Sequence, residues 1–462
     1  MFTKEIAELI KGVSYKHLPS AAIDAAKMAI LDCLGVTLAG CNEMSSSIIC
    51  QYTKRISQSA DAGIIGRGFK TSVEQAAWVN GTQAHALDYD DYFALSCLTP
   101  YHPTAPILPA VLAVAEKDHL SGRDVLLAYI TGFEVEAIIA KVCVRQQYDL
   151  GWHTTSTLGS LGAAAAVAKI LKLDEEKSRI ALGIASSLAG GLRRNFGTMT
   201  KPLHAGNAAR NGAVAAMLAQ SGFTADRDIL DSPLSFCEVL SGETKPLAEV
   251  PDMNLGVRPE FYIISPGIAF KSYPSCACSH WAIDAALDLK RGNTIAPRDI
   301  VDIECRTSSG LPRILVHSRP TTALEGKFSI EFCVAIALID GEVSLKQFSD
   351  RIVRDSAVQE LIQKVRYVHP PEMGSGLNNL KGEIVVRLKN GKVYSRRVNI
   401  ARGDPRNPLN KDEVISKYRD CVSLSLSPED TDMSLNIISR LESINDITEL
   451  MDILVFGTAR VQ

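Results

Sequence analysis

The sequence contains no uncharged apolar run of about 18 residues, the length that a helix needs to cross a bilayer. It also lacks an excess of either charge, because 49 lysines and arginines nearly balance 52 aspartates and glutamates. No block of like charge stands out, so nucleic acid and anionic membranes are not expected as partners. The first residues lack the apolar stretch and the cleavage site of a signal peptide, so we expect a cytoplasmic protein.

Cysteine is scarce for a disulfide-stabilised protein, with 11 residues at irregular spacing among 462. These cysteines are predicted to be reduced thiols that mostly pack in the core. The GxGxxG fingerprint and the GxxxxGK[ST] phosphate loop are absent, and so is the HExxH zinc motif. No motif therefore calls for a nucleotide cofactor or a metal.

Helical periodicity is what the sequence does contain, and it dominates residues 1–265. Apolar residues recur at helical spacing after Pro19-Ser20, and a turn at Ser121-Gly122 is predicted to separate two helices. The stretch 155–191 is rich in alanine and glycine, which predicts closely packed, buried helices. Few segments show the alternation of apolar and polar residues that is typical of β-strands.

The pattern changes after about residue 266. DIVDIECRTSS predicts a strand, SIEFCVAIALIDG a helix, and the turn at Asn390-Gly391 a β-hairpin. Helical spacing returns after Pro405 and Pro408. We therefore predict a mainly α protein in which residues 1–265 and 401–462 form a large all-helical domain, with residues 266–400 inserted as a smaller, lid-like α+β domain.

The first of four polar clusters is HALDYDDYFALSCLTPYHPTAP, residues 85–106. Its three aspartates, Asp88, Asp90 and Asp91, are close like charges, which requires solvent, a cation or one protonated member. Carboxylate and imidazole suit a metal, but their spacing matches neither the zinc patterns nor the EF-hand loop. An ordinary polar loop that caps helices is the alternative.

The second cluster is GWHTTSTLGSLGAA, residues 151–164. His153 precedes a run of hydroxyls at the expected start of a helix, where Thr154, Thr155 or Ser156 could be the N-cap. A histidine beside unpaired backbone N–H groups suits a pocket for a carboxylate. The alternative is that His153 only caps or packs.

The third and fourth clusters add basic groups and thiols. Residues 190–212 hold Arg193, Arg194, Lys201 and His204, which could bind a small anion unless the arginines lie on a solvated loop. The fourth cluster, KSYPSCACSHWAIDAALDL at residues 271–289, has too few zinc ligands and no CxxC partner. A Cys–His nucleophilic pair would need the two side chains adjacent in space. If a helix begins near Ser279, its first turn contains the histidine and the cysteines lie on the approach.

Taken together, the clusters resemble the MmgE/PrpD family. The stretches that carry the resemblance are NGTQAHALDYDD, His102-Pro103, GWHTTSTLGSLGAAAA, GTMTKPLHAGNAARNG and KSYPSCACSHWAIDAA, so it covers essentially the whole chain. Members of the family include 2-methylcitrate dehydratases, cis-aconitate decarboxylases and iminodisuccinate epimerases. The resemblance implies the inserted-domain fold, an active site between the two domains, a homodimer and no obligatory cofactor or metal.

The resemblance also implies the site residues. The decarboxylase pattern matches this chain at Asp88, His102, His153, Lys201 and Lys271. The chain departs from it at Tyr92, where the decarboxylase has a threonine, and at Cys276, where it has a histidine, whereas His280 is matched. The loop between Tyr92 and His102 is also longer here.

The roles of these residues follow from the chemistry. A reaction at a carbon atom beside a carboxylate needs a base, an acid and fixed positive charge. Lys201 and Lys271 are expected to bind substrate carboxylates, with His204 or Arg193. His102 and His153 are the acid–base candidates, because imidazole titrates near neutral pH. The remaining candidates are Asp88 (orienting group or base), Tyr92 (proton donor), Cys276 (possible base) and His280 (substrate contact).

Three functions remain open on this reading. The first is a cofactor-free lyase that dehydrates or decarboxylates a small di- or tricarboxylate. The second is an epimerase of an iminodisuccinate-like dicarboxylate, which the departures at Tyr92 and Cys276 favour. The third, a carboxylate-binding protein without catalysis, is disfavoured because all five matched side chains are retained.

Overall fold

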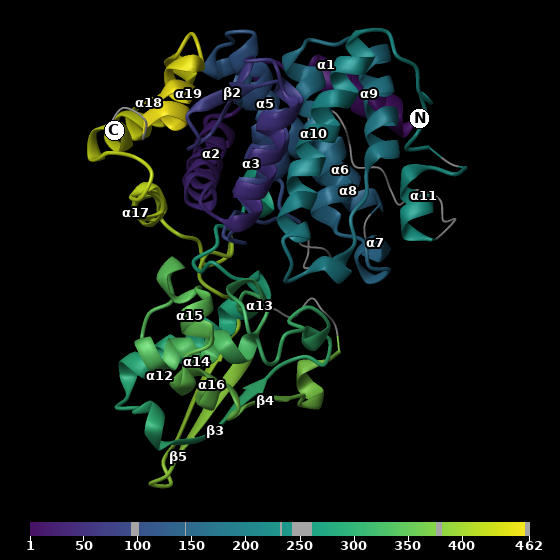
Figure 1. The fold of residues 1–462 in the computed structure, drawn as a ribbon. Helices are drawn as coiled ribbons and strands as arrows, with labels where there is room; N and C mark the ends of the chain where they lie inside the picture. The colour runs from purple at the N-terminus through teal and green to yellow at the C-terminus, as the bar shows by residue number, and fades with distance from the viewer. Residues whose placement is uncertain (94–100, 144, 232, 243–260, 376–380, 458–462) are drawn as a thin grey trace. The chain divides into compact units, whose positions relative to one another are not determined.

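The computed structural model describes residues 1–93, 101–143, 145–231, 233–242, 261–375 and 381–457 (Figure 1). Two compact units divide the chain: unit 1 has residues 1–194, 200–268 and 410–462, and unit 2 has residues 195–199 and 269–409. Helices predominate over strands in the described residues, so the prediction of a mainly α protein is confirmed.

Unit 1 is built from helices drawn from both ends of the chain. They are α1 (Phe2–Gly12), α2 (Ser20–Gly40), α3 (Met44–Ile56), α4 (Val73–His85), α5 (Thr104–Lys117), α6 (Gly122–Cys143), α7 (Arg145–Asp149), α8 (Thr154–Ile170), α9 (Glu175–Leu188), α10 (Thr200–Gln220), α11 (Phe236–Ser241), α17 (Lys411–Val422), α18 (Pro428–Ser439) and α19 (Thr448–Phe456). The C-terminal α17 packs on α2. Its start is set by a capping box between Asn410 and Glu413.

Small residues let α4, α8 and α10 pack closely. A Cβ atom at Gly206 of α10 would collide with the Trp78 carbonyl of α4, and one at Gly212 would collide with Ala163 of α8. Glycine is therefore required for this approach. The packing brings the C-terminal end of α4 to the first turn of α10, where candidate site residues lie.

Unit 1 is not entirely helical, which corrects the prediction of an all-helical domain. Strands β1 (Ala62–Ile64) and β2 (Phe69–Thr71) form an antiparallel hairpin. Its turn has two glycines at positive φ, Gly66 at 70° and Gly68 at 68°. Each strand has only three residues, too few to produce a detectable alternation.

Unit 2 combines a four-stranded sheet with helices. Its elements are α12 (His280–Gly292), β3 (Ile300–Arg306), α13 (Ala323–Gly326), α14 (Ile330–Asp340), α15 (Asp350–Val353), α16 (Ser356–Ile362), β4 (Val365–Val368), β5 (Gly382–Leu388) and β6 (Val393–Val398). The strand order is β4-β3-β5-β6, parallel between β3 and β4 and antiparallel elsewhere. Helices α12 and α14 pack against the sheet (Figure 1).

The predicted hairpin in unit 2 is confirmed. Strand β5 pairs with β6, and the Leu388 N–H donates to the Lys392 carbonyl across the turn at 2.9 Å. Gly391 has φ +81°, a conformation that glycine adopts without strain.

For the cysteines that are free in the described residues, the prediction of reduced thiols that mostly pack in the core is confirmed. Those described as free are mostly buried, and Cys276 is only half-buried. Cys237, however, forms a disulfide, so the prediction of reduced thiols is wrong at this residue. Cysteine spacing could not indicate this, because disulfide pairing depends on approach in the fold. Within the described residues, no helix has both the length and the apolar character to span a bilayer.

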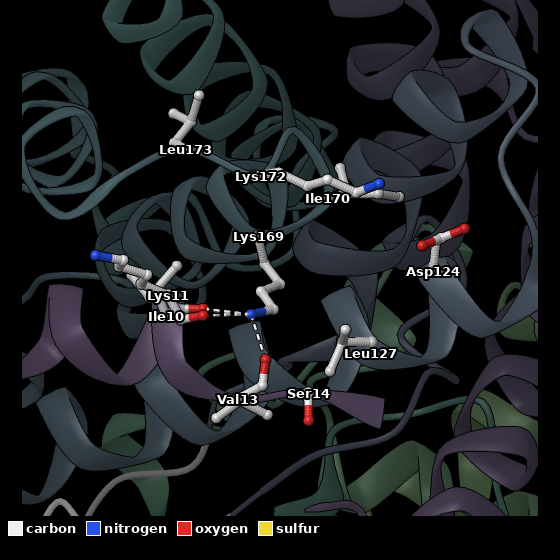
Figure 2. A pocket seen from close by; sticks show the side chains of 10 residues that line it. All are labelled: Ile10, Lys11, Val13, Ser14, Asp124, Leu127, Lys169, Ile170, Lys172 and Leu173. Atoms are coloured by element: carbon white, nitrogen blue, oxygen red, sulfur yellow. Dashed lines mark hydrogen bonds between the residues drawn. The ribbon is translucent and has the colours of Figure 1, made fainter. Parts of the chain in front are cut away.

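A pocket of about 250 Å³ lies in unit 1 at the C-terminal end of α1 (Figure 2). Lys169 donates from Nζ to the carbonyl of Ile10 at 2.7 Å, to that of Lys11 at 3.1 Å and to that of Val13. The last carbonyls of a helix have no partner within it, so Lys169 caps α1. Burial lowers the pKa of Lys169 to about 8. None of the predicted site residues lines this pocket.

Candidate active site

A cluster of titratable side chains lies in unit 1 where several elements begin or end. His85 is the last residue of α4, and the loop after it carries the three aspartates. His102 lies two residues before α5, and His153 is the N-cap of α8. Lys201 and His204 lie in the first turns of α10. The structure thus brings together residues from three of the four sequence clusters.

Lys201 is the cation of the cluster. Its Nζ donates to His85 Nε2 at 2.7 Å and lies 3.2 Å from Asp88 Oδ1. Only 4% of Lys201 is exposed, and a buried ammonium is tolerated only when it is paired. The site therefore presents a fixed positive charge, which is what a substrate carboxylate needs.

Asp90 is shared by two histidines. His85 Nδ1 lies 2.8 Å from Asp90 Oδ2, and His102 Nδ1 lies 3.0 Å from the same oxygen. Burial alone would raise the pKa of Asp90, but His102 and His85 offset this and hold it well below its usual value. The carboxylate is therefore ionised and can only accept, so both Nδ1 atoms carry the proton.

His85 is a neutral imidazole in this arrangement. Burial, assisted by the charge of Lys201, lowers the pKa of His85 to about 3 despite the opposing effect of Asp90. With the proton on Nδ1, Nε2 is the atom that accepts from Lys201. The ring of His85 also lies edge-on to His102, with centroids 4.4 Å apart.

Asp88 adopts a backbone conformation that few residues with a Cβ tolerate. Its φ is +51°, in the left-handed region, where aspartate is among the better accepted residues. This turn follows α4 directly, since the Asp88 N–H donates to the His85 carbonyl at 3.2 Å. Its Oδ1 faces both Lys201 and His102 Nε2, the latter at 3.9 Å.

Asp91 differs from its two neighbours. It is fully buried and hydrogen-bonded to Thr104, and burial raises its pKa well above the usual value. Like-charge repulsion among the aspartates is thus relieved as the sequence required: Asp88 faces a cation, Asp90 faces two histidines, and burial favours the neutral form of Asp91.

His153 and His204 form a second pair, with their Nδ1 atoms 3.0 Å apart. Burial and then the charge of Lys201 lower both pKa values, that of His204 to about 4, so both rings are neutral. One Nδ1 therefore donates and the other accepts. The prediction of Thr154, Thr155 or Ser156 as the N-cap is wrong, because His153 itself occupies that position. The helix starts one residue early since the Thr154 backbone is already helical.

The ligand atoms of four residues, His85, Asp88, Asp90 and His102, all lie within 4.8 Å of one another and could hold a metal ion by distance alone. Two of these residues, however, already contact the Lys201 ammonium. A divalent cation would be repelled by this charge. The side chains of these four residues therefore suit the Lys201 ammonium better than a metal ion.

The other residues predicted for unit 1 lie around the cluster. Tyr92 is buried, and the main chain of the adjacent Phe93 pairs with that of Tyr101. Residues 94–100 lie outside the described residues. The Arg193 guanidinium donates to the Tyr148 carbonyl at 2.5 Å and lies 3.7 Å over the ring of Tyr148. Arg194 is exposed, as expected for at least one of the two arginines.

Unit 2 holds the fourth cluster. Helix α12 begins at His280, so the cysteines lie on the approach to it, as predicted. His280 Nε2 donates to the Ser275 carbonyl at 3.2 Å. Lys271 is 1% exposed. Of the two thiols, Cys278 is buried and Cys276 is half-buried, a difference that the sequence could not show.

His85 and Asp90 hold Lys201 and His102 in the cluster, but neither was among the site residues predicted from the sequence. Both lay within the first sequence cluster, so composition pointed to their neighbourhood. Their roles depend on distances to Lys201 and His102, which are not encoded in spacing along the chain.

Comparison with known proteins identifies two family matches. The profile of the MmgE/PrpD N-terminal domain matches residues 4–248, and that of the MmgE/PrpD C-terminal domain matches residues 273–443. The chain is 30% identical to the cis-aconitate decarboxylase of Mus musculus over 466 residues, which cover 98% of this chain and 93% of the relative. Its identity to the decarboxylase of Homo sapiens is also 30%, with 98% and 94% covered. It is 24% identical to the 2-methylcitrate dehydratase of Escherichia coli (strain K12), with 80% and 78% covered.

Proposed function

Because this chain belongs to the MmgE/PrpD family, we propose that it is a lyase that acts on a small tricarboxylate by acid–base chemistry beside a carboxylate. The observation that carries the proposal is the buried Lys201 ammonium, held by His85 and Asp88 with His102 alongside. The decarboxylases are 30% identical to this chain, whereas the dehydratase of Escherichia coli is 24% identical. Decarboxylation of a cis-aconitate-like acid is therefore the leading activity, and dehydration of a methylcitrate-like acid the next.

In this proposal Lys201 binds one carboxylate of the substrate. In decarboxylation a C–C bond breaks, CO₂ leaves, and the electron pair passes into the neighbouring unsaturated carboxylate until a proton reaches carbon. In dehydration a base removes a proton from carbon, and an acid protonates the departing hydroxyl. His102 has its Nε2 turned toward Asp88 Oδ1, so it is the group we assign to proton transfer, with His153 as the second.

We further propose that the reaction needs no cofactor. The resemblance assigns Lys271 to a substrate carboxylate and His280 to a substrate contact. Cys276 and Tyr92, together with Arg193, would then set which acid is accepted. An epimerase of an iminodisuccinate-like acid remains the second candidate, because Cys276 replaces a histidine and a thiol can act as a base.

The test is incubation of the protein with cis-aconitate, methylcitrate, citrate and iminodisuccinate in D₂O, followed by NMR. We expect loss of CO₂ from cis-aconitate with deuterium incorporated at carbon, or loss of water from methylcitrate or citrate. Samples without protein serve as controls for spontaneous reaction. Deuterium uptake with inversion of iminodisuccinate and no elimination would replace the lyase by the epimerase, and no reaction with any acid would contradict both.

We also propose a homodimer, on the strength of the family resemblance alone. One chain has a mass of 50.0 kDa, so light scattering coupled to gel filtration is expected to give twice that mass. A particle with the mass of one chain would contradict the proposal.

A further inference from the structure

We propose that Asp90 is the positioning residue of the site, because its carboxylate holds both His85 and His102 in the tautomer that leaves Nε2 as the acceptor. Through His85 it fixes the orientation of Lys201, and through His102 it prepares the proton-transfer atom. This proposal rests on the proposed function for its kinetic consequences, whereas the tautomers can be measured without any substrate.

The geometry at Asp90 requires both Nδ1 atoms to carry a proton. The Asp90 side chain is fully buried and accepts from both Nδ1 atoms, at 2.8 Å from His85 and 3.0 Å from His102. The Asp90 carboxylate is ionised and has no proton to donate. Neither ring can move its proton to Nε2 without placing a lone pair against the carboxylate.

The tautomer of His85 decides what Lys201 can do. An ammonium has only donors, so the 2.7 Å contact with His85 Nε2 requires a lone pair on that nitrogen. With the proton on Nε2, two donors would face each other and Lys201 would have to leave its position. The contact with Asp88 Oδ1 alone would then hold the ammonium.

The two histidines are not equally dependent on Asp90. His102 Nδ1 also donates to the main-chain carbonyl of Asp91 at 2.7 Å, and a carbonyl can only accept. This second bond keeps His102 in its tautomer when the carboxylate is changed. For His85 Nδ1, Asp90 is the hydrogen-bond partner that the structure identifies.

Asp90→Asn therefore has an asymmetric expected result. Both carboxylate oxygens lie near His85 Nδ1, Oδ1 at 3.0 Å and Oδ2 at 2.8 Å, so whichever of them the NH₂ group replaces, a donor then faces that nitrogen. His102 keeps its proton on Nδ1, and the amide N–H is directed at His85 Nδ1, which moves the His85 proton to Nε2. We expect kcat/KM for the accepted tricarboxylate to fall by about 10- to 100-fold, with most of the loss in KM, because Lys201 binds the carboxylate.

The experiment records ¹⁵N spectra of histidine-labelled full-length protein, because the two ring nitrogens report the tautomer directly. The wild type is expected to show Nδ1–H for both His85 and His102, and Asp90→Asn to show Nε2–H for His85 alone. Asp90→Glu, which still only accepts, should keep both wild-type tautomers and recover part of the activity. Glu136→Gln is the matched control, because it makes the same change from carboxyl to amide at a buried residue outside the cluster, where burial raises the pKa of the carboxyl.

The proposal is overturned if His85 carries its proton on Nε2 in the wild type, or if Asp90→Asn leaves both the spectra and kcat/KM unchanged. Since the wild-type spectrum needs no variant, misfolding of Asp90→Asn would not prevent the test. If the wild-type tautomers are as stated but none of the acids reacts, the proposed lyase fails and the positioning of Lys201 by Asp90 stands.

Discussion

Lys201→Met is expected to lower kcat/KM for a tricarboxylate by about 100-fold or more, the usual cost of removing one electrostatic contact to a developing charge. Methionine keeps the length and the apolar stem of lysine but removes the ammonium. The side chain is almost fully buried, so water cannot easily supply a replacement charge. The measurement is steady-state kinetics on whichever acid the wild type converts.

Loss of Lys201 also leaves Asp88 without its cation, which could destabilise the fold by about 3–5 kcal/mol. The double variant Lys201→Met/Asp88→Asn removes both charges and should recover much of the unfolding free energy without recovering activity. Lys169→Met is the matched control, because this lysine caps α1 away from the cluster. It should lower stability and leave kcat/KM unchanged. Wild-type rates in Lys201→Met would overturn the assignment of the site.

The parts of the fold that the sequence predicted are those with strong local signals. The capping box at Asn410 and Glu413 starts α17, and the turn at Asn390-Gly391 closes the hairpin of β5 and β6, since both depend on residues a few positions apart. The sequence did not predict the hairpin of β1 and β2, because its strands are too short to show an alternation of apolar and polar residues.

The sequence indicated which residue types the candidate site contains. It could not indicate which of its acids are ionised. The sequence presented Asp88, Asp90 and Asp91 as equivalent acids and required some relief of their repulsion. Which of them is ionised depends on partners from other parts of the chain: Lys201 from α10, and His102 from the segment just before α5. Burial without such a partner raises the pKa of Asp91 and favours its neutral form.

His102→Ala is expected to lower kcat by about 100-fold or more, because a positioned general acid or base contributes at least this factor. The substitution should leave the loop in place, since the His102 main-chain N–H donates to the Thr155 hydroxyl at 3.1 Å and does not need the imidazole. Asp90 keeps His85 as a partner, so the position of Lys201 should also survive. The expected signature is therefore a fall in kcat with a much smaller change in KM.

Added imidazole tests whether the His102 side chain transferred protons or only supported the backbone around it. We expect it to restore part of kcat in His102→Ala and to do nothing for Lys201→Met, because imidazole can replace a proton carrier but not a buried ammonium. His119→Ala is the matched control: His119 is an exposed histidine paired with Asp446 in the same unit, and its loss should leave both constants unchanged. A wild-type kcat in His102→Ala would move the proton transfer to His153, whose neutral ring is paired with His204. In that case His153→Ala, and not His102→Ala, should lower kcat and respond to imidazole.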